Sequence, residues 1–457
     1  MALKGERFDG HAFLPEAAAK GAAAAVVRKG TAGIPGLPFF EVFDTLAALG
    51  ALAALHRRRF SIPVAAIGGS AGKTTTKEMV AAILRTRGPA LATEGNFNNE
   101  VGVPLTLLKL APEHRAAVVE LGMSAPGELQ RITALVCPDA AVLTLIAAEH
   151  LEFLKNLDGV AAAEGELYRG LLPGSVAVVN ADDARCVAQA ERVASGVKKI
   201  FFGKSALADV RLSRVTALGV EGQEICLEGE EWDVPLGGRE KKIFFEEKDG
   251  EGGAEARRLR SGAKLRLGKF TIRLGFVGEH NAMNAAAAAA VARALSFSFE
   301  EISRGLSSAR PYAHRSRLVA GAGGITILDD CYNASPASME AALATLEGLC
   351  VRGSARAIAV LGDMLELGTA EESAHRDLGR SAQGRLDLAA FFGPRSSLTF
   401  REFSSSSSSP PSAHFTEIEP LLAWLRPRLQ PGDTVLVKGS RGMKLERVVD
   451  ALVTPPA

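Results

Sequence analysis

The sequence predicts an α/β protein whose parallel sheets are covered by helices on both faces. Strand-like runs such as Val64–Ile67, Ala117–Leu121, Ala140–Ile146 and Val176–Val179 are continuously apolar rather than alternating, which is the pattern of parallel strands buried on both sides. Helix-like segments separate these runs, as the connections of a parallel sheet require. From about residue 311 the alternation returns, with strands expected at 325–328, 357–361, 388–392 and 434–438.

The beginning of the chain holds few elements. It contains an alanine-rich helix from Pro15 to Ala25, a short strand at Ala25–Val27 and a second helix from Thr45 to Arg59. This is little for an independent domain, so we expect the first part of a small α/β domain to be missing. We predict three domains, which comprise residues 1–60, 61–310 and 311–457.

The middle of the chain changes character between about Lys199 and Arg273. Short β-like runs there surround a charged, glycine-rich segment, Gly237–Gly262, which predicts a small β-rich appendage with a mobile loop. A helix is expected to follow over Asn281–Leu295, because its six consecutive alanines favour helix.

Composition narrows the function classes. A formal net charge of +1 over 457 residues gives no support for a nucleic-acid or membrane-surface partner. No apolar run approaches the roughly 20 residues of a membrane span. The five cysteines are scattered without a CxxC pair, which suggests neither a disulfide framework nor a zinc site. These features favour a cytoplasmic protein.

A glycine-rich loop follows the first strand of the second domain and opens a helix. Backbone N–H groups at such a helix N-terminus point at an anion, a lysine reaches the β- and γ-phosphates, and the next hydroxyl ligates Mg²⁺. The loop is shorter than the full phosphate-loop signature, since Ile67 stands where that signature has glycine. An ordinary strand-to-helix turn is the alternative. We expect nucleotide binding by Gly69, Ser70, Ala71, Gly72, Lys73, Thr74 and Thr75.

Polar side chains follow several other predicted strands. Glu120 ends one strand and His150 comes shortly after the next. Ligands collect beyond the carboxyl ends of strands in an open parallel sheet, so Glu120 is a candidate ligand of the nucleotide's metal. Asn281 and Asn284 lie three residues apart on a helix face and could hold a base or ribose, with helix capping as the alternative.

Four segments together resemble the Mur ligase superfamily. They are GNFNN at 95–99 with GVP at 102–104, DDCYNASP at 329–336, LGDMLELG at 361–368 and VKGSR at 437–441. The resemblance covers essentially the whole chain. It implies a partial N-terminal α/β domain for a UDP-sugar, a central phosphate-loop domain for ATP with a small β-rich appendage, and a Rossmann-like C-terminal domain.

The resemblance also implies an activity. Members of the most similar branch use ATP and Mg²⁺ to join D-alanyl-D-alanine to UDP-N-acetylmuramoyl-tripeptide through an acyl phosphate, which serves peptidoglycan synthesis. A monomer is expected. Two alternatives within the superfamily are the ligase that adds the third amino acid and folylpolyglutamate synthase. A third alternative is a nucleotide-binding protein that no longer ligates.

Roles are carried over from the family residue by residue. Lys73 would stabilise the transferring phosphoryl group, Thr74 and Glu120 would hold the Mg²⁺ of ATP, and His150 would hold a second Mg²⁺. The other matching positions are Asn281 and Asn284 for adenine, Asp330 for ribose, Asn333 and Arg315 near the phosphates, Lys438, Ser440 and Arg441 at the dipeptide site, and Asn96, Asn98 and Asn99 for substrate.

The sequence departs from the family pattern at three places. Glu164 stands where many relatives carry a carbamylated lysine, and we expect its carboxylate to help place the metal. His314 stands where relatives usually have glycine, directly before Arg315. An Asp-Ser-Arg motif of the uridine site is absent from the start of the chain, which supports the expectation of a truncated N-terminal domain.

Overall fold

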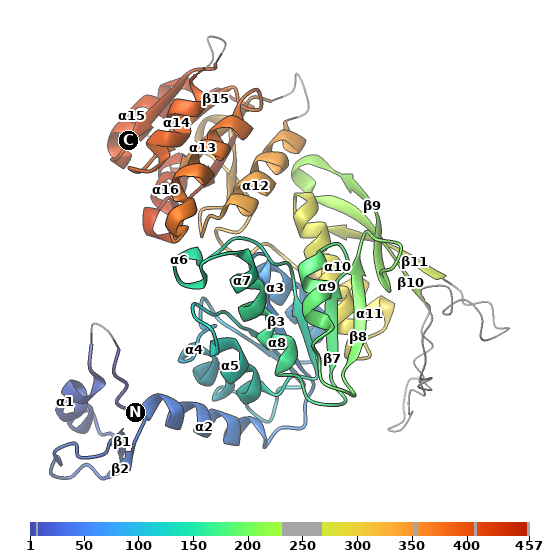
Figure 1. Ribbon diagram of the computed structural model, residues 1–457. Coiled ribbons are helices and arrows are strands. Elements are labelled where there is room, and N and C mark those ends of the chain that lie inside the picture. The colour runs from blue at the N-terminus through green and yellow to red at the C-terminus, as the bar shows by residue number, and fades with distance from the viewer. Residues whose placement is uncertain (6–7, 231–266, 351–354, 406–408, 455–457) are drawn as a thin grey trace.

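Three bodies of secondary structure follow one another along the chain (Figure 1). The computed structural model describes all residues except 6–7, 231–266, 351–354, 406–408 and 455–457. The charged segment Gly237–Gly262 therefore lies outside the described residues. Among the helices that are described, none is long and apolar enough to cross a membrane.

The N-terminal body is small and lies apart from the C-terminal body in Figure 1. Its two parallel strands are accompanied by two helices: β1 Ala25–Arg28, β2 Phe39–Val42, α1 Leu14–Ala19 and α2 Thr45–Arg57. The sequence analysis missed β2, whose side chains are all at least partly exposed, so it lacks an apolar signature. It also ran α1 too far, because Gly21 with φ of 84° ends the helix.

The central body is built on a sheet with the order β11-β10-β9-β8-β7-β6-β3-β5-β4. All five side chains of β3 and of β5 are buried, as their continuous apolar sequences predicted. The strands are β3 Val64–Gly68, β4 Ala90–Ala92, β5 Ala116–Glu120, β6 Ala140–Leu143, β7 Val176–Asn180, β8 Lys198–Gly203, β9 Val210–Ala217, β10 Gln223–Glu230 and β11 Leu267–Leu274.

The predicted β-rich segment is present and continues this sheet. Strand β9 pairs in parallel with β8 at Phe202 and Gly203, and β10 and β11 then add antiparallel. The strands therefore extend the central sheet rather than forming a separate unit. Sequence periodicity could not show this, because it does not reveal which edge a strand joins.

Helices cover both faces of the central sheet. One face carries α3, α10 and α11, and the alanines of α10 are buried on every side, which lets α10 pack closely against α3. The helices are α3 Lys73–Leu84, α4 Gly102–Leu107, α5 Glu128–Val136, α6 Leu151–Leu154, α7 Leu157–Glu164, α8 Glu166–Arg169, α9 Ala184–Ala190, α10 Glu279–Ala294 and α11 Phe299–Ser308.

The C-terminal body has a second sheet with the order β12-β13-β17-β14-β15-β16. Only β12 runs antiparallel to its neighbour. The strands are β12 Arg317–Ala320, β13 Thr326–Asp329, β14 Ala357–Gly362, β15 Leu388–Phe392, β16 Ser412–Phe415 and β17 Thr434–Lys438. The helices are α12 Pro336–Leu349, α13 Glu371–Ala382, α14 Ser396–Phe403, α15 Ile418–Leu425 and α16 Glu446–Val453.

The order of the central sheet fixes where a ligand can bind. Strand β3 pairs with β5 on one side and with β6 on the other. The chain runs from β3 to β4 and β5 on one side and then crosses β3 to reach β6 on the other. Such a switch point opens a crevice beyond the carboxyl ends of the strands. The predicted phosphate loop follows β3 directly, and Glu120 ends β5.

Candidate active site

The loop between β3 and α3 has the geometry of an anion-binding turn. Gly72 caps α3 with φ of 83°, and a Cβ atom at this position would lie 2.3 Å from Oδ1 of Asn284. Only glycine therefore fits, both sterically and conformationally. The N-terminus of α3 presents its unpaired N–H groups to the same space.

Hydrogen bonds from the neighbouring strand hold this loop in place. Thr144, just beyond β6, donates from Oγ1 to the carbonyl of Ala71 at 2.5 Å, and Asn180 at the end of β7 donates to the carbonyl of Thr144 at 2.7 Å. The hydroxyl of Ser70 donates to the carbonyl of Ala147 at 3.0 Å. The loop is consequently preorganised by the ends of β6 and β7.

Lys73 lies among carboxylates at the base of the loop. Its Nζ atom donates to the carbonyl of Gly69 at 2.6 Å and lies 3.7 Å from a carboxylate oxygen of Glu149. Burial alone would lower the pKa of Lys73, but Glu149, Glu164 and Glu120 together raise it above its ordinary value. Lys73 is therefore a fixed positive charge.

Glu164 lies directly behind the phosphate loop. Its Oε2 atom accepts a hydrogen bond from the backbone N–H of Gly69 at 2.9 Å, and Glu149 is a neighbouring carboxyl group. Burial raises the pKa of Glu164 to about 8, Lys73 opposes the rise and Glu149 adds to it. Glu164 therefore supports the loop, and the expected role in placing the metal stays a prediction.

The raised pKa of Glu164 predicts a pH-dependent stability. The folded chain binds this proton more tightly than the unfolded chain, whose carboxyl has an ordinary pKa near 4.5. The stabilisation is thus complete below pH 4.5 and is lost as pH rises through about 8. Glu164→Gln keeps an acceptor for Gly69 without the titrating group. Between pH 6 and 8.5, we expect the melting temperature of the unaltered chain to fall by about 2–4 °C more than that of Glu164→Gln.

The same variant tests the metal role. Glu164→Gln is expected to weaken Mg²⁺-dependent turnover, because a neutral amide replaces a carboxyl that can ionise. Turnover measured against Mg²⁺ concentration checks this. An unchanged Mg²⁺ dependence would leave Glu164 with a purely structural role, and parallel melting curves would contradict the pH argument.

Glu120 offers one free carboxylate oxygen to the crevice. Its Oε1 atom accepts from Nδ2 of Asn98 at 2.9 Å, whereas Oε2 is buried without a partner among the described residues. Oε1 of Glu149 is likewise buried without a hydrogen-bond partner among the described residues. Buried carboxylate oxygens normally have a partner, and Mg²⁺ prefers oxygen ligands. These residues, with the hydroxyl of Thr74, therefore fit a divalent cation.

His150 joins the central body to the C-terminal body. Its Nδ1 atom lies 2.7 Å from Oε2 of Glu366, and its Nε2 atom lies 3.9 Å from Oε2 of Glu149. Both His150 and Glu366 have positive φ values, 48° and 64°. The histidine thus lies on the predicted edge, and its partner there comes from the 361–368 segment.

The C-terminal sheet contributes a second set of side chains. Arg315 reaches across to the phosphate loop, where Nη2 lies 3.4 Å from Oγ1 of Thr74, and its guanidinium lies 4.0 Å from the ring centroid of Tyr332. Arg441 lies over the same ring at 5.6 Å. Two predicted arginines are therefore oriented by one aromatic side chain that was not predicted as a site residue.

Asp330 and Lys438 form a buried pair beyond β13 and β17. Nζ of Lys438 donates to Oδ2 of Asp330 at 2.6 Å and to the carbonyl of Asn333 at 3.0 Å. The other carboxylate oxygen of Asp330 accepts from the N–H of Ser316 at 2.9 Å. Ser440 fixes the adjoining loop by accepting from the N–H of Leu365 at 2.9 Å.

Asn281 and Asn284 of α10 lie on the side of the crevice that is formed by the phosphate loop. Nδ2 of Asn284 donates to Oδ1 of Asn281 at 3.1 Å, and Asn281 donates to the carbonyl of Val277 at 2.8 Å. His280, beside them, is half-buried; desolvation lowers its pKa, and Asp330 partly opposes this shift. A neutral imidazole therefore borders the same space.

A cavity of about 340 Å³ connects these groups. It is lined by residues of both sheets, and most of the predicted site residues contribute to it. These are Ser70, Ala71, Gly72, Thr74, Thr75, His150, Asn281, Asn284, Arg315, Asp330, Asn333, Lys438, Ser440 and Arg441.

Some predicted residues do not line this cavity. Gly69, Lys73, Glu120 and Glu164 are not among its lining residues. Asn96 is exposed, and Asn99 uses its side chain to accept from the N–H of Gly102 at 2.9 Å, at the start of α4. The expected contacts of Asn96, Asn98 and Asn99 with substrate stay predictions.

The sequence analysis missed several residues that build the site. Thr144 follows β6 and Asn180 ends β7, as Glu120 ends β5, so the same strand-end signal could have found them. Glu149, Tyr332 and Glu366 lie within segments that the analysis singled out, yet no role was assigned to them. His280 carries no separate sequence signal, because only its position on the cavity lining distinguishes it.

Comparisons with known proteins agree with this architecture. Residues 67–292 match the model of the Mur ligase middle domain, and residues 314–441 match that of the Mur ligase, glutamate ligase domain. The chain is 33% identical to the UDP-N-acetylmuramoyl-tripeptide–D-alanyl-D-alanine ligase of Bacillus subtilis, over 99% of this chain and 90% of that protein.

Solved structures show the same likeness. A crystal structure of MurF from Acinetobacter baumannii superposes with a TM-score of 0.82 at 33% identity, covering 99% of this chain and 89% of that one. MurF from Thermotoga maritima in complex with ADP superposes with a TM-score of 0.81 at 27% identity, covering 99% and 93%. On these matches, and on a cavity that joins a phosphate loop to a second α/β sheet, the chain belongs to the Mur ligase family.

Proposed function

We propose that this protein is the ATP-dependent ligase that joins D-alanyl-D-alanine to UDP-N-acetylmuramoyl-tripeptide. The observation that carries the proposal is the cavity between the two sheets, where the phosphate loop on one side faces Arg315, Asp330 and Lys438 on the other. The substrates are those in the name of the Bacillus subtilis relative. ATP is supported by the ADP bound to the Thermotoga maritima relative.

In the proposed reaction a carboxylate is activated before it is joined to an amine. The terminal carboxylate of the tripeptide attacks the γ-phosphorus of ATP, which gives an acyl phosphate and ADP. The amine of D-alanyl-D-alanine then attacks the acyl carbon, and the tetrahedral intermediate releases phosphate as the amide forms. Positioning and neutralisation of charge are the contributions required of the protein.

The residues of the cavity fit these contributions. Lys73 supplies a fixed positive charge at the base of the phosphate loop, and Arg315 supplies a second one that already contacts Thr74. Glu120 and Thr74, with Glu149, would hold Mg²⁺, which supplies further neutralisation of phosphate charge when it is bound. Asn281, Asn284 and Asp330 line the part of the cavity proposed for the nucleoside.

The dipeptide is proposed to bind beside the segment 437–441. Ser440 and Arg441 line the cavity next to Lys438, and the guanidinium of Arg441 suits the carboxylate of D-alanyl-D-alanine.

We further propose that the chain has three domains, at 1–60, 61–310 and 311–457, and that the first binds the UDP-sugar. We also propose that the protein is a monomer with a cytoplasmic location. The location is supported by five free cysteines, which suit a reducing compartment.

Phosphate release tests the proposal. The chain is incubated with ATP, Mg²⁺ and UDP-N-acetylmuramoyl-tripeptide, with and without D-alanyl-D-alanine. We expect sustained phosphate release only when the dipeptide is present, and we expect mass spectrometry to identify UDP-N-acetylmuramoyl-pentapeptide as the product.

The superfamily alternatives are tested in parallel with UDP-N-acetylmuramoyl-dipeptide plus a diamino acid, and with a folate plus glutamate. Release with either pair but not with D-alanyl-D-alanine would overturn the assignment, and nucleotide binding without any release would indicate a protein that does not ligate.

A further inference from the structure

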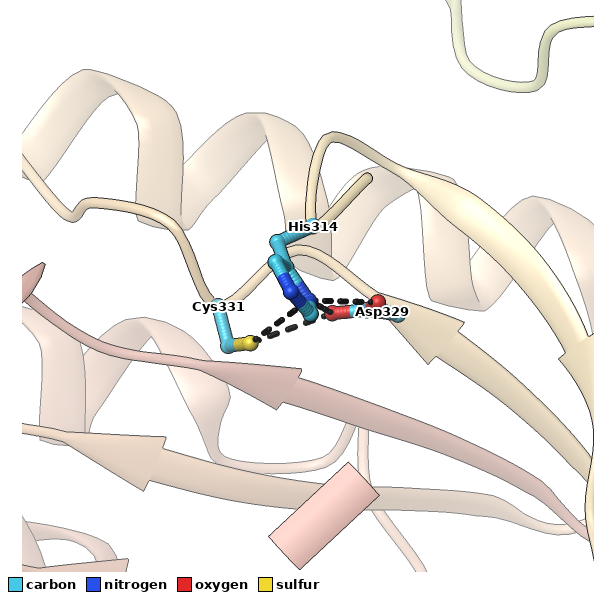
Figure 2. A group of neighbouring side chains, drawn as sticks. All are labelled: His314, Asp329 and Cys331. Atoms are coloured by element: carbon cyan, nitrogen blue, oxygen red, sulfur yellow. Dashed lines mark hydrogen bonds and ion pairs between the residues drawn. The ribbon is translucent and has the colours of Figure 1, made fainter. Parts of the chain in front are cut away.

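Three side chains of different chemistry converge beside the turn that carries Arg315. His314 comes from the turn before β12, Asp329 ends β13 and Cys331 follows it, and their polar atoms point toward one another (Figure 2). The side chains of Asp329 and Cys331 are almost fully buried, whereas that of His314 is 31% exposed. The cluster is thus closed on the protein side and reachable through the imidazole.

The spacing of the three atoms resembles the edges of a tetrahedral metal site. Nδ1 of His314 lies 3.2 Å from Oδ1 of Asp329, Sγ of Cys331 lies 3.1 Å from the same oxygen, and Sγ lies 3.6 Å from Nδ1. With Zn–S about 2.3 Å and Zn–N and Zn–O about 2.0–2.1 Å, ligand atoms around zinc lie about 3.3–3.6 Å apart. Shifts of a few tenths of an ångström would accommodate the ion.

The geometry does not fit a cysteine–histidine–aspartate relay. A relay needs the thiol on one ring nitrogen and the carboxylate on the other. Here Nδ1 of His314 faces both Asp329 and Cys331. A nitrogen, an oxygen and a sulfur atom that lie this close together are instead arranged like the ligands of one metal ion.

Charge favours a cation at this point. The carboxylate of Asp329 is buried, and among the described residues its ion pair is with His314, not with a lysine or arginine. A buried carboxylate is costly unless a positive charge or strong donors compensate it. A divalent ion would provide that compensation.

The backbone at His314 gives an independent indication. Its φ is 62°, a left-handed conformation that costs a non-glycine residue about 1–3 kcal/mol, and the sequence analysis noted that relatives usually have glycine here. The chain therefore accepts strain that directs an imidazole at Asp329 and Cys331. Observed strain of this kind is a pointer to function.

We propose that His314, Asp329 and Cys331 form a binding site for a single zinc-class divalent cation. The imidazole binds through Nδ1, the carboxylate through one oxygen and the sulfur as thiolate, while water occupies the fourth position. Mg²⁺ does not compete, because it prefers an all-oxygen set of ligands. The site is therefore distinct from the one proposed at Glu120 and Thr74.

Binding at this site releases a proton. Burial and the neighbouring Asp329 carboxylate raise the pKa of the Cys331 thiol, so without the ion the thiol is protonated and donates to Asp329. A coordinating thiol is deprotonated by the metal, which gives one Zn–S bond and one proton in solution. In the ring of His314 the proton resides on Nε2 once Nδ1 is bound.

The site would couple the cation to the active-site cavity. His314 precedes Arg315, and Asp329 and Cys331 flank Asp330, so the bound ion ties together the two segments that present these residues to the cavity. The proposal does not depend on the ligase assignment, because binding is measured without ATP or peptide substrates.

Zinc titration of the purified, chelator-treated full chain tests the site. In competition with a chromophoric zinc chelator, and with millimolar Mg²⁺ present, we expect one Zn²⁺ per chain and one proton released per Zn²⁺. Cys331→Ser and His314→Gly are expected to bind about 100-fold more weakly, since loss of an outer partner alone costs roughly 10–100-fold. His314→Gly is expected to fold normally because glycine suits its positive φ.

A cysteine elsewhere in the same domain serves as the matched control. Cys350→Ser removes a half-buried thiol and should bind zinc as the unaltered chain does. With Co²⁺ in place of Zn²⁺, a thiolate-to-cobalt charge-transfer band is expected for the unaltered chain and for Cys350→Ser but not for Cys331→Ser. Failure of the unaltered chain to take up zinc would overturn the proposal, and so would a zinc affinity of Cys331→Ser and His314→Gly equal to that of the unaltered chain.

Discussion

Replacing Lys73 with alanine is expected to abolish ligation, with turnover at least about 10²–10³-fold lower, the scale seen when one preorganised group at a developing charge is removed. The structure gives the reason. Three carboxylates keep Lys73 charged at the base of the phosphate loop, and this charge lies where the proposed phosphoryl transfer develops negative charge. Alanine leaves the carboxylate of Glu149 without the positive charge that lies 3.7 Å from it.

The measurement is the rate of phosphate release with both peptide substrates present. Lys109→Ala is the matched control, because Lys109 is exposed and its Nζ atom pairs with Glu94 at 2.7 Å, away from the cavity. It should leave turnover unchanged. Circular dichroism and melting curves should show that Lys73→Ala folds. Near-normal turnover in a folded Lys73→Ala would contradict the phosphate-loop argument.

Glu120→Gln is expected to lower turnover about 100-fold at low millimolar Mg²⁺ and to raise the Mg²⁺ concentration needed for half-maximal rate. Oε2 of Glu120 is buried without a partner among the described residues, while Oε1 is held by Asn98. An amide cannot supply the anionic oxygen that a divalent cation prefers. Stability should fall little, because glutamine can still accept from Asn98.

A Mg²⁺ titration of turnover separates this effect from a general loss of activity. Glu94→Gln is the control, since Glu94 is exposed and lies in the loop after β4. Binding of ATP without Mg²⁺ should be retained by Glu120→Gln. A proportional loss of turnover at every Mg²⁺ concentration would mean that Glu120 acts through the shape of the site and not through the metal.

Much of the fold could be predicted because the strands carry their signal locally. The runs at 388–392 and 434–438 match β15 and β17 to the residue, since the interior of a strand buried on both faces is apolar. The phosphate loop around Gly72 could be predicted for a similar reason, because its glycines and Lys73 lie between a strand and the start of a helix. Strand β2 is weakly buried and therefore has no such local signal. No local signal shows either that β9 pairs with β8 at the edge of the central sheet.

The sequence by itself determined the α/β class, the phosphate loop and the strand ends on which Glu120, Asp330 and Lys438 stand. Only the tertiary structure decided which of these meet. Arg315 contacts Thr74 across 241 positions of sequence, and His314, Asp329 and Cys331 face one point because β12 turns back antiparallel on β13. Pairing of strands and closure of one body on another depend on contacts between distant residues, and local sequence patterns do not record them.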